Sequence, residues 1–283
     1  MSTSPTRELS VAASPSTPFG DDGGTARWAG LRWAVPSFVT VAALIAIWQV
    51  YVTSSGVRPQ VLPSPLRVVQ QGWAHRDEIG SHAAATLQVT LIGFAVSLSL
   101  AWVLAVVVDF SPWLRRALVP LFVASQTVPV VAIAPLMIIW FGFGLLPKIL
   151  VVALVTFFPM AIGLIEGFAA ADRDAGALLR SMGASRLQVF RYVRLPSALP
   201  RFFTALRIGI TYAVVGAVFA EYVGASVGLG IYMNLQKNSF RTDLVLAAVL
   251  VAAVLSIALY LSTFAIERLV APWSRAQNRS RRD

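Results

Sequence analysis

Polar residues that interrupt long apolar stretches are the first candidates for chemistry in this sequence. Gln126 and Thr127 precede Pro129, where an irregular helix would leave carbonyl oxygens free to line a solute pathway. Glu221 is a carboxylate within an apolar stretch, which is costly and by default indicates a function or a buried partner. It is followed by Gly224, Gly228 and Gly230. We therefore expect Glu221 to brace a glycine-rich outer loop or a gate rather than to bind an anion.

Catalysis on this chain is not indicated. The sequence contains no G-x-x-x-x-G-K-[ST] loop and no H-E-x-x-H motif. It has no cysteine, so thiolate ligands and cysteine nucleophiles are excluded. His75 and His82 have no third candidate ligand nearby, and no paired polar groups suggest an intramembrane enzyme. We expect no catalytic residue, metal or cofactor here.

The composition is that of a membrane protein. The 283 residues are 57% hydrophobic and 13% charged, with a mean hydropathy of +0.72. Soluble domains are usually about 45–50% apolar and about 25% charged. The net charge of +10 does not indicate a nucleic-acid partner, because the basic residues are not clustered with aromatic ones.

The long apolar segments predict an all-α fold with six membrane spans. A bilayer core of about 30 Å needs roughly 20 apolar residues of helix, and the segments do not alternate as barrel strands would. The predicted spans are Trp33–Val52, Ala83–Val108, Ala117–Trp140, Ile149–Ile165, Phe202–Val223 and Leu244–Ile266.

The distribution of Lys and Arg predicts the orientation. With the N-terminus inside, 17 of the 23 basic residues fall in cytoplasmic segments, which is the bias that topology follows. We expect a multi-pass protein of the cell (inner) membrane with both termini cytoplasmic. Its predicted parts are a disordered tail at 1–30, a first span with an external segment at 31–82, a core at 83–270 and a basic tail at 271–283.

The cytoplasmic loop 172–196 has the pattern of two short helices joined by a capped turn. Leu178 and Met182 recur at helical spacing on one apolar face. Gly183 is a natural C-cap, and Ser185 with Gln188 three residues later forms a capping-box pattern. Pro196 is expected to end the second helix. The loop predicts docking of a cytoplasmic partner; the alternative is an amphipathic helix on anionic headgroups.

Four stretches resemble one family. The chain reads LPSPLRVV after the first span, VPVVAIAPLMIIWFGFG in the third, GASRLQVFRYVRLPSALP in the loop and VFAEYVGASVGLG after the fifth. These stretches are similar to those of ABC importer permeases of the nitrate/sulfonate/taurine type. The loop resembles their EAA motif in Gly183, Leu195 and Pro196, while Ala177 stands where the family has Glu and Val193 replaces Ile.

The resemblance implies a type I ABC importer permease-like fold and a loop that sits in a groove of an ATPase subunit. It implies coupling through the following residues: Ala177, Leu178, Met182, Gly183, Ala184, Ser185, Phe190, Leu195 and Pro196. The pathway or gate would be formed near Gln126, Thr127, Pro129 and Glu221.

The implied partners are an ABC ATPase subunit dimer that binds ATP and Mg, an external solute-binding protein, a second permease copy (a homodimer) and membrane lipid. The solute would be a small organic or inorganic anion such as a sulfonate, taurine or nitrate. A vitamin precursor, riboflavin or a thiamine pyrimidine, remains an alternative. An ion-coupled secondary transporter is the alternative of another class.

Overall fold

The computed structural model describes residues 25–270, which divide into two units at Tyr51. The predicted tail 271–283 and most of the predicted tail 1–30 lie outside the described residues. In the first unit, α1 (Thr25–Ser55) contains the predicted first span, and the side chains of Val35, Phe38 and Leu44 on it are exposed. All other helices within residues 25–270 lie in the second unit.

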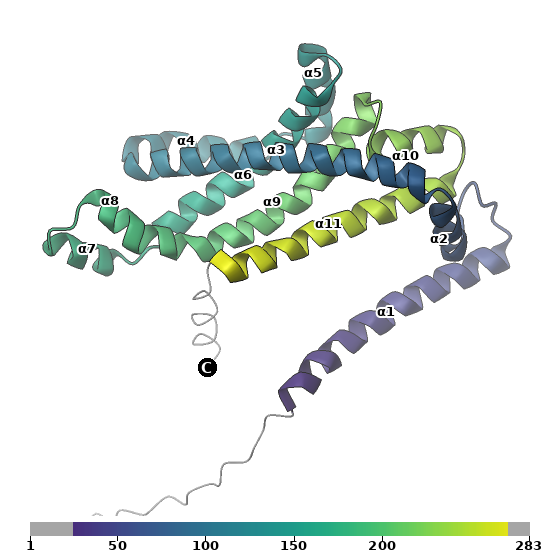
Figure 1. Ribbon diagram of the computed structural model, residues 1–283, viewed down its shortest axis with the longest axis horizontal. Coiled ribbons are helices and arrows are strands. Elements are labelled where there is room, and N and C mark those ends of the chain that lie inside the picture. The colour runs from purple at the N-terminus through teal and green to yellow at the C-terminus, as the bar shows by residue number, and fades with distance from the viewer. Residues whose placement is uncertain (1–24, 271–283) are drawn as a thin grey trace, which may run out of the picture. The chain divides into compact units, whose positions relative to one another are not determined.

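Helices account for the fold, and no strand occurs within residues 25–270. Five helical stretches are long and apolar enough to cross a membrane. Four of them lie in the second unit (Figure 1): α3 (Arg76–Phe110), α6 (Leu145–Ala169), α9 (Leu195–Gly224) with the helical turns before it, and α11 (Thr242–Val270). Each contains one of the predicted spans, so the all-α, polytopic prediction is confirmed.

The third predicted span, Ala117–Trp140, is not one helix. The structure divides it into α4 (Pro112–Ser125) and α5 (Val130–Phe141), with an irregular segment at 126–129. Pro129 lacks an N–H and disfavours helical backbone at the preceding residue, which explains the position of the break. Helices of 14 and 12 residues are each shorter than the roughly 20 residues a straight span requires.

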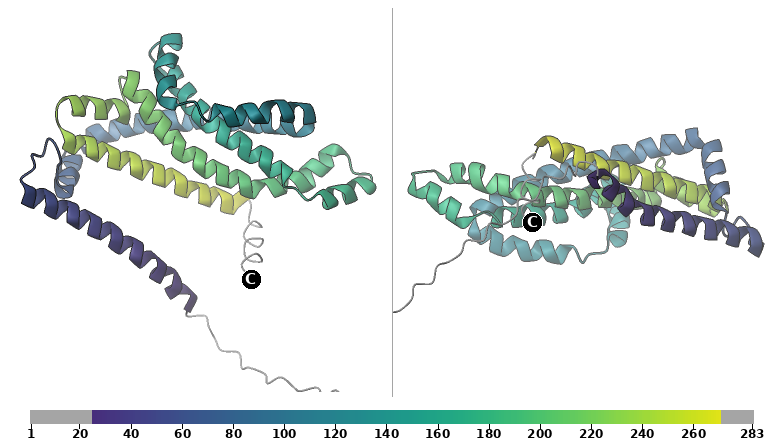
Figure 2. Two further views of the ribbon diagram at one scale, coloured as in Figure 1. Left: turned by 180° about the vertical axis from the view of Figure 1, so that it is seen from behind. Right: turned by 90° about the horizontal axis from the view of Figure 1, so that it is seen from below.

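The core of the second unit is made by α3, α6 and α9, which lie side by side in both views of Figure 2. Small residues permit the close approach of α6 and α9. A Cβ added at Gly163 would lie 2.4 Å from the Ala205 Cβ, and one at Gly167 would lie 3.0 Å from the Ala198 Cα. Close packing through small residues is the usual way in which membrane helices associate.

Short helices lie at the two ends of this bundle (Figure 1). One end carries α2 (Pro65–Ala74) and α10 (Leu229–Asn238). The other carries α7 (Arg173–Ser181), α8 (Arg186–Val189) and the π-helical turn η1 (Phe190–Arg194). The loop 172–196 and the glycine-rich loop after Glu221 are therefore at opposite ends.

Pro196 does not end the second helix of the loop, contrary to the sequence-based expectation. The helix runs from α8 through η1 directly into α9. Within η1 the Leu195 N–H bonds the Phe190 carbonyl five residues back. Because Pro196 has no N–H and its ring would clash with the carbonyl four residues earlier, this wider turn lets the helix continue past it.

Candidate translocation and coupling sites

Glu221 lies fully buried near the C-terminal end of α9 and holds the start of α10. Its Oε2 accepts hydrogen bonds from the Thr86 hydroxyl at 2.8 Å and from the Gly230 N–H at 3.0 Å. Thr86 in turn accepts the Leu229 N–H at 2.8 Å. The carboxylate thus satisfies an N–H that the first turn of a helix leaves unpaired. These are the contacts that a brace would make.

The two glycines around this carboxylate are required by space. A Cβ at Gly228 would lie 2.2 Å from the Glu221 Cδ, and one at Gly230 would lie 2.1 Å from the Val218 carbonyl oxygen. Gly228 also has φ +136°, which side chains disfavour. The sequence showed the glycines near Glu221, and the structure explains their positions.

His82 and Tyr232 complete this cluster around Glu221. The Gly228 N–H donates to His82 Nδ1 at 3.0 Å, and the rings of His82 and Tyr232 lie 5.0 Å apart. Burial, with a smaller contribution from Glu78, raises the pKa of Tyr232 to about 12. Its hydroxyl and Glu221 Oε1 have no hydrogen-bond partner within the described part of the chain. The cluster therefore has two buried polar atoms not yet explained.

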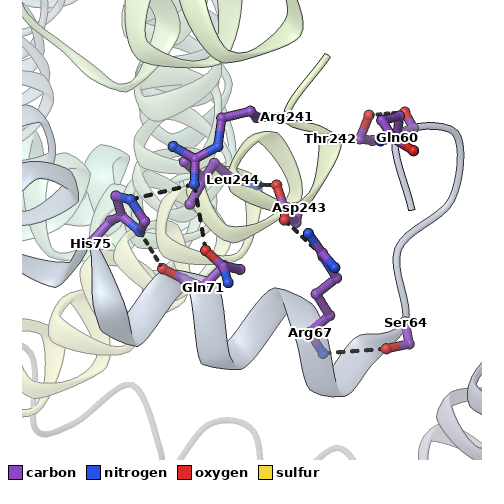
Figure 3. A network of polar contacts seen from close by, with 9 residues as sticks. All are labelled: Gln60, Ser64, Arg67, Gln71, His75, Arg241, Thr242, Asp243 and Leu244. Carbon is purple, nitrogen blue, oxygen red and sulfur yellow. Dashed lines mark hydrogen bonds and ion pairs between the residues drawn. The ribbon is translucent and has the colours of Figure 1, made fainter. Parts of the chain in front are cut away.

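A second polar network fixes α2 to the start of α11 at the same end (Figure 3). Arg67 Nε donates to Asp243 Oδ2 at 2.9 Å, and Arg241 lies 3.5 Å from the Gln71 amide oxygen and 3.4 Å from His75 Nε2. His75 Nδ1 lies 3.0 Å from the Gln71 carbonyl. His75 therefore has an arginine and a carbonyl as neighbours, and no metal-ligating group of three is found within residues 25–270.

The break between α4 and α5 opens onto a cavity of about 330 Å³. Gln126 lines it together with Ser125, Phe158 and Tyr212, whereas Thr127 and Pro129 do not. The Thr127 hydroxyl donates instead to the Ala124 carbonyl at 2.7 Å. Among the described residues, no charged side chain lines this cavity. Of the predicted pathway residues, only Gln126 contacts it, and Glu221 belongs to the cluster beside α10.

The loop 172–196 has the capped geometry that its sequence predicts. Gly183 has φ +86°, the left-handed conformation of a C-cap. The Ser185 N–H donates to the Gln188 side chain at 2.7 Å, and the Gln188 N–H donates to Ser185 Oγ at 3.3 Å. Asp172 caps α7 by accepting the N–H groups of Asp174 and Ala175. Both short helices therefore have fixed starting points.

The predicted coupling residues divide into an exposed and a packed group. Leu178 and Met182 are 63% and 75% exposed, and Ala177, Gly183 and Ser185 are exposed as well. Ala184, Leu195 and Pro196 are partly buried. Phe190 packs on the rings of Phe110 and Phe168 at 5.4 and 5.2 Å. Phe190 therefore packs the loop against the spans, while the exposed group, with Leu178 and Met182, stays on the surface of the protein.

Sequence reasoning missed the ion pair that ties this loop to α3. Arg194 Nη1 lies 2.7 Å from both carboxylate oxygens of Asp109, and the Asp109 side chain is only 5% exposed. The two residues are 85 positions apart, so no local pattern relates them. A lone Asp at the end of an apolar stretch was the available signal.

Apolar spans, a broken helix beside a cavity and a capped helical pair at one end are features of a polytopic membrane protein. The chain belongs to the family of binding-protein-dependent transport system inner membrane components, whose profile matches residues 93–276. It is the permease subunit of an ABC importer, a transport component of the inner membrane. This membership favours ATP-driven import over the ion-coupled alternative.

Individual relatives agree with this assignment. The chain is 39% identical over 237 residues to the riboflavin transport system permease protein RibX of Chloroflexus aurantiacus, covering 83% of this chain and 88% of the relative. It is 32% identical over 255 residues to the taurine transport system permease protein TauC of Escherichia coli, covering 87% and 92%. A chain of the inward-facing MetNI methionine ABC transporter shares the fold with a TM-score of 0.57 at 19% identity, covering 65% of this chain and 92% of that chain.

Proposed function

We propose that the segment 172–196 couples this permease to a separate ATPase subunit dimer, which binds ATP and Mg. The exposed apolar side chains of Leu178 and Met182, on a helical pair with fixed caps, carry this proposal. Large apolar side chains that stay exposed on a well-ordered polar segment are typical of a protein interface. Phe190 and the Arg194–Asp109 ion pair hold the segment against the spans, so that a displacement of the loop reaches α3 and α9.

The membrane orientation in this proposal puts the segment 172–196 and both termini in the cytoplasm. The excess of Lys and Arg in those segments supports it, as does the position of the segment at the opposite end of the bundle from α2 and α10. An external solute-binding protein would then deliver solute to the end formed by α2 and α10, and lipid would surround the exposed apolar faces of the spans.

A second permease copy completes the pathway in this proposal. The cavity at the α4–α5 break is bordered by exposed residues, among them Gln126 and Tyr212. A symmetric partner would cover them, and a homodimer is the simplest arrangement because closed two-fold assemblies are the commonest oligomers.

For the solute, the cavity favours the vitamin-precursor alternative over the anion. Its polar groups are Ser125, Gln126 and the Tyr212 hydroxyl, and Phe158 supplies an aromatic face. These groups suit a neutral heteroaromatic molecule such as riboflavin, the solute in the name of the RibX relative. A sulfonate, taurine or nitrate would have to rely on the N–H groups at the start of α5. Uptake of labelled riboflavin competed with taurine would separate the two.

The coupling role predicts the effect of making the exposed loop surface polar. In Leu178→Ser/Met182→Ser, two side chains lose burial worth about 1.5–3 kcal/mol each, so retention of the ATPase subunit should fall at least 100-fold at about 1.4 kcal/mol per tenfold. Co-purification of the Walker-motif subunit and solute uptake measure this. Leu235→Ser, the same change at a 53% exposed position on α10, is the matched control for retention of the ATPase subunit. Equal retention in the double variant and the control would contradict the coupling role.

A further inference from the structure

Two adjoining cavities lie between the loop 172–196 and the inner ends of the spans. Their volumes are about 300 and 250 Å³, and both are lined by Asp109, Arg180, Val189 and Arg194. The larger one adds Arg115 and Arg173, and the smaller one adds Arg186. We call the two together the arginine cavity. Since one water needs about 10–15 Å³ of such volume, there is room for a considerably larger group.

The positive charge of this cavity is not neutralised by its own acids. Asp109 is engaged by Arg194, and Asp172, the other carboxylate in the lining, accepts two N–H groups at the start of α7. Arg115, Arg173, Arg180 and Arg186 form no ion pair or side-chain hydrogen bond among residues 25–270. Four guanidinium groups from three helices thus border one space without an anionic partner.

We propose that the arginine cavity binds a phosphate group. Guanidinium presents a planar fork of donors that matches phosphate oxygens in pairs, with charge-assisted hydrogen bonds. A phosphate between Arg115 on α4 and Arg180 on α7 would also relieve the mutual repulsion of the arginines. The site goes beyond the ATPase contact, because the exposed side chains of Leu178 and Met182 do not line it.

The headgroup of an anionic phospholipid is the source that the surroundings favour. The cavity lies where α3 and α6 end and α4 begins, and Trp113 beside it is 75% exposed. Exposed tryptophan and arginine at the end of a span are typical of the headgroup level. A bound headgroup would join α4 to α7, so the lipid composition would affect how firmly the loop is held.

The test uses the full-length permease purified in nanodiscs, with phosphatidylglycerol or with phosphatidylcholine, whose choline the arginines repel. Native mass spectrometry should show phosphatidylglycerol retained by the parent protein, and retention should fall at least tenfold in Arg115→Gln/Arg180→Gln. Arg191→Gln is the matched control, because this exposed arginine of η1 lines neither cavity. Thermal unfolding verifies folding, and the single variant Arg173→Gln replaces the double variant if that one does not fold.

A second arm titrates inorganic phosphate into the permease in phosphatidylcholine. Saturable binding that the same substitutions abolish, without selective lipid retention, would support the site with free phosphate as its source. If neither probe binds, or if the substitutions leave binding unchanged, the proposal is overturned. Loss of the ATPase subunit in these variants without binding of either probe would overturn it too, and would assign the arginines to a protein contact.

Discussion

At the scale of single residues, Glu221 shows how a carboxylate is kept inside an apolar bundle. The group has no cation partner in its hydrogen bonds; it is held by Thr86 and by the N–H of Gly230. An N–H at the start of a helix carries partial positive charge, so α10 supplies part of what an arginine would. Burying this carboxylate is unfavourable, but its hydrogen bonds join α3 to α10, two segments far apart in sequence.

Substitution of Glu221 separates a bracing role from a role of its charge. Glu221→Gln retains an acceptor for Thr86 and Gly230, and we expect most of the uptake to remain. Glu221→Ala leaves the buried N–H of Gly230 unpaired, at about 1–3 kcal/mol, and removes one of the two acceptors of the Thr86 hydroxyl, which also lies 3.2 Å from the His82 carbonyl. The protein level and uptake should therefore both fall. Both quantities are measured for each variant.

The control is Glu78→Ala, which removes an exposed carboxylate from the same end of the bundle. If Gln and Ala variants are equally inactive at normal protein level, the charge itself is needed. If the Ala variant has full uptake and protein level, neither role is correct.

At the scale of helices, the close packing of α6 on α9 predicts that alanine at Gly167 and alanine at Gly80 have opposite effects on stability. Gly167→Ala would place a Cβ 3.0 Å from the backbone of Ala198, which cannot move without displacing α9, and overpacking costs about 1–3 kcal/mol. Gly80→Ala, also within a helix, meets no atom within 4 Å and should gain about 0.5–1 kcal/mol from helix propensity. Thermal unfolding in detergent compares them. A lower midpoint for Gly80→Ala than for Gly167→Ala would refute this account of the packing.

The sequence predicts those features that depend on neighbouring residues. The cap at Gly183 and the capping box at Ser185 follow from local chemistry, and five of the six spans follow from apolar length. Pro129 suggested an irregular backbone within the third predicted span. The apolar composition of the span gave no sign that it would form two separate helices. The Arg194–Asp109 pair depends on a contact between α3 and η1, which no local pattern contains. Pro196 is visible in the sequence, but it did not reveal that a π turn lets the helix continue past it.

At the scale of the whole molecule, the two ends of the second unit predict a labelling pattern. Ser181→Cys lies at the end of α7, and Ser239→Cys follows α10 at the other end; both positions are exposed. In intact cells an impermeant thiol reagent should label Ser239→Cys and spare Ser181→Cys, and the Cys-free chain gives no background. Permeabilised cells serve as the control, in which both variants should react. Labelling of Ser181→Cys in intact cells would invert the proposed orientation.

The continuous helix through Pro196 has a consequence for the direction of signalling. From Arg186 to Gly224 the chain is one run of 39 helical residues, about 58 Å long at 1.5 Å per residue. One end of it starts at the capped turn, and the other end contains Glu221. Coupling between binding sites at the two ends of one helix is reciprocal. If a partner bound at one end changes the affinity for a ligand at the other end by some factor, that ligand changes the affinity for the partner by the same factor. If partners bind at both ends of this helix, each affects the other with the same coupling free energy.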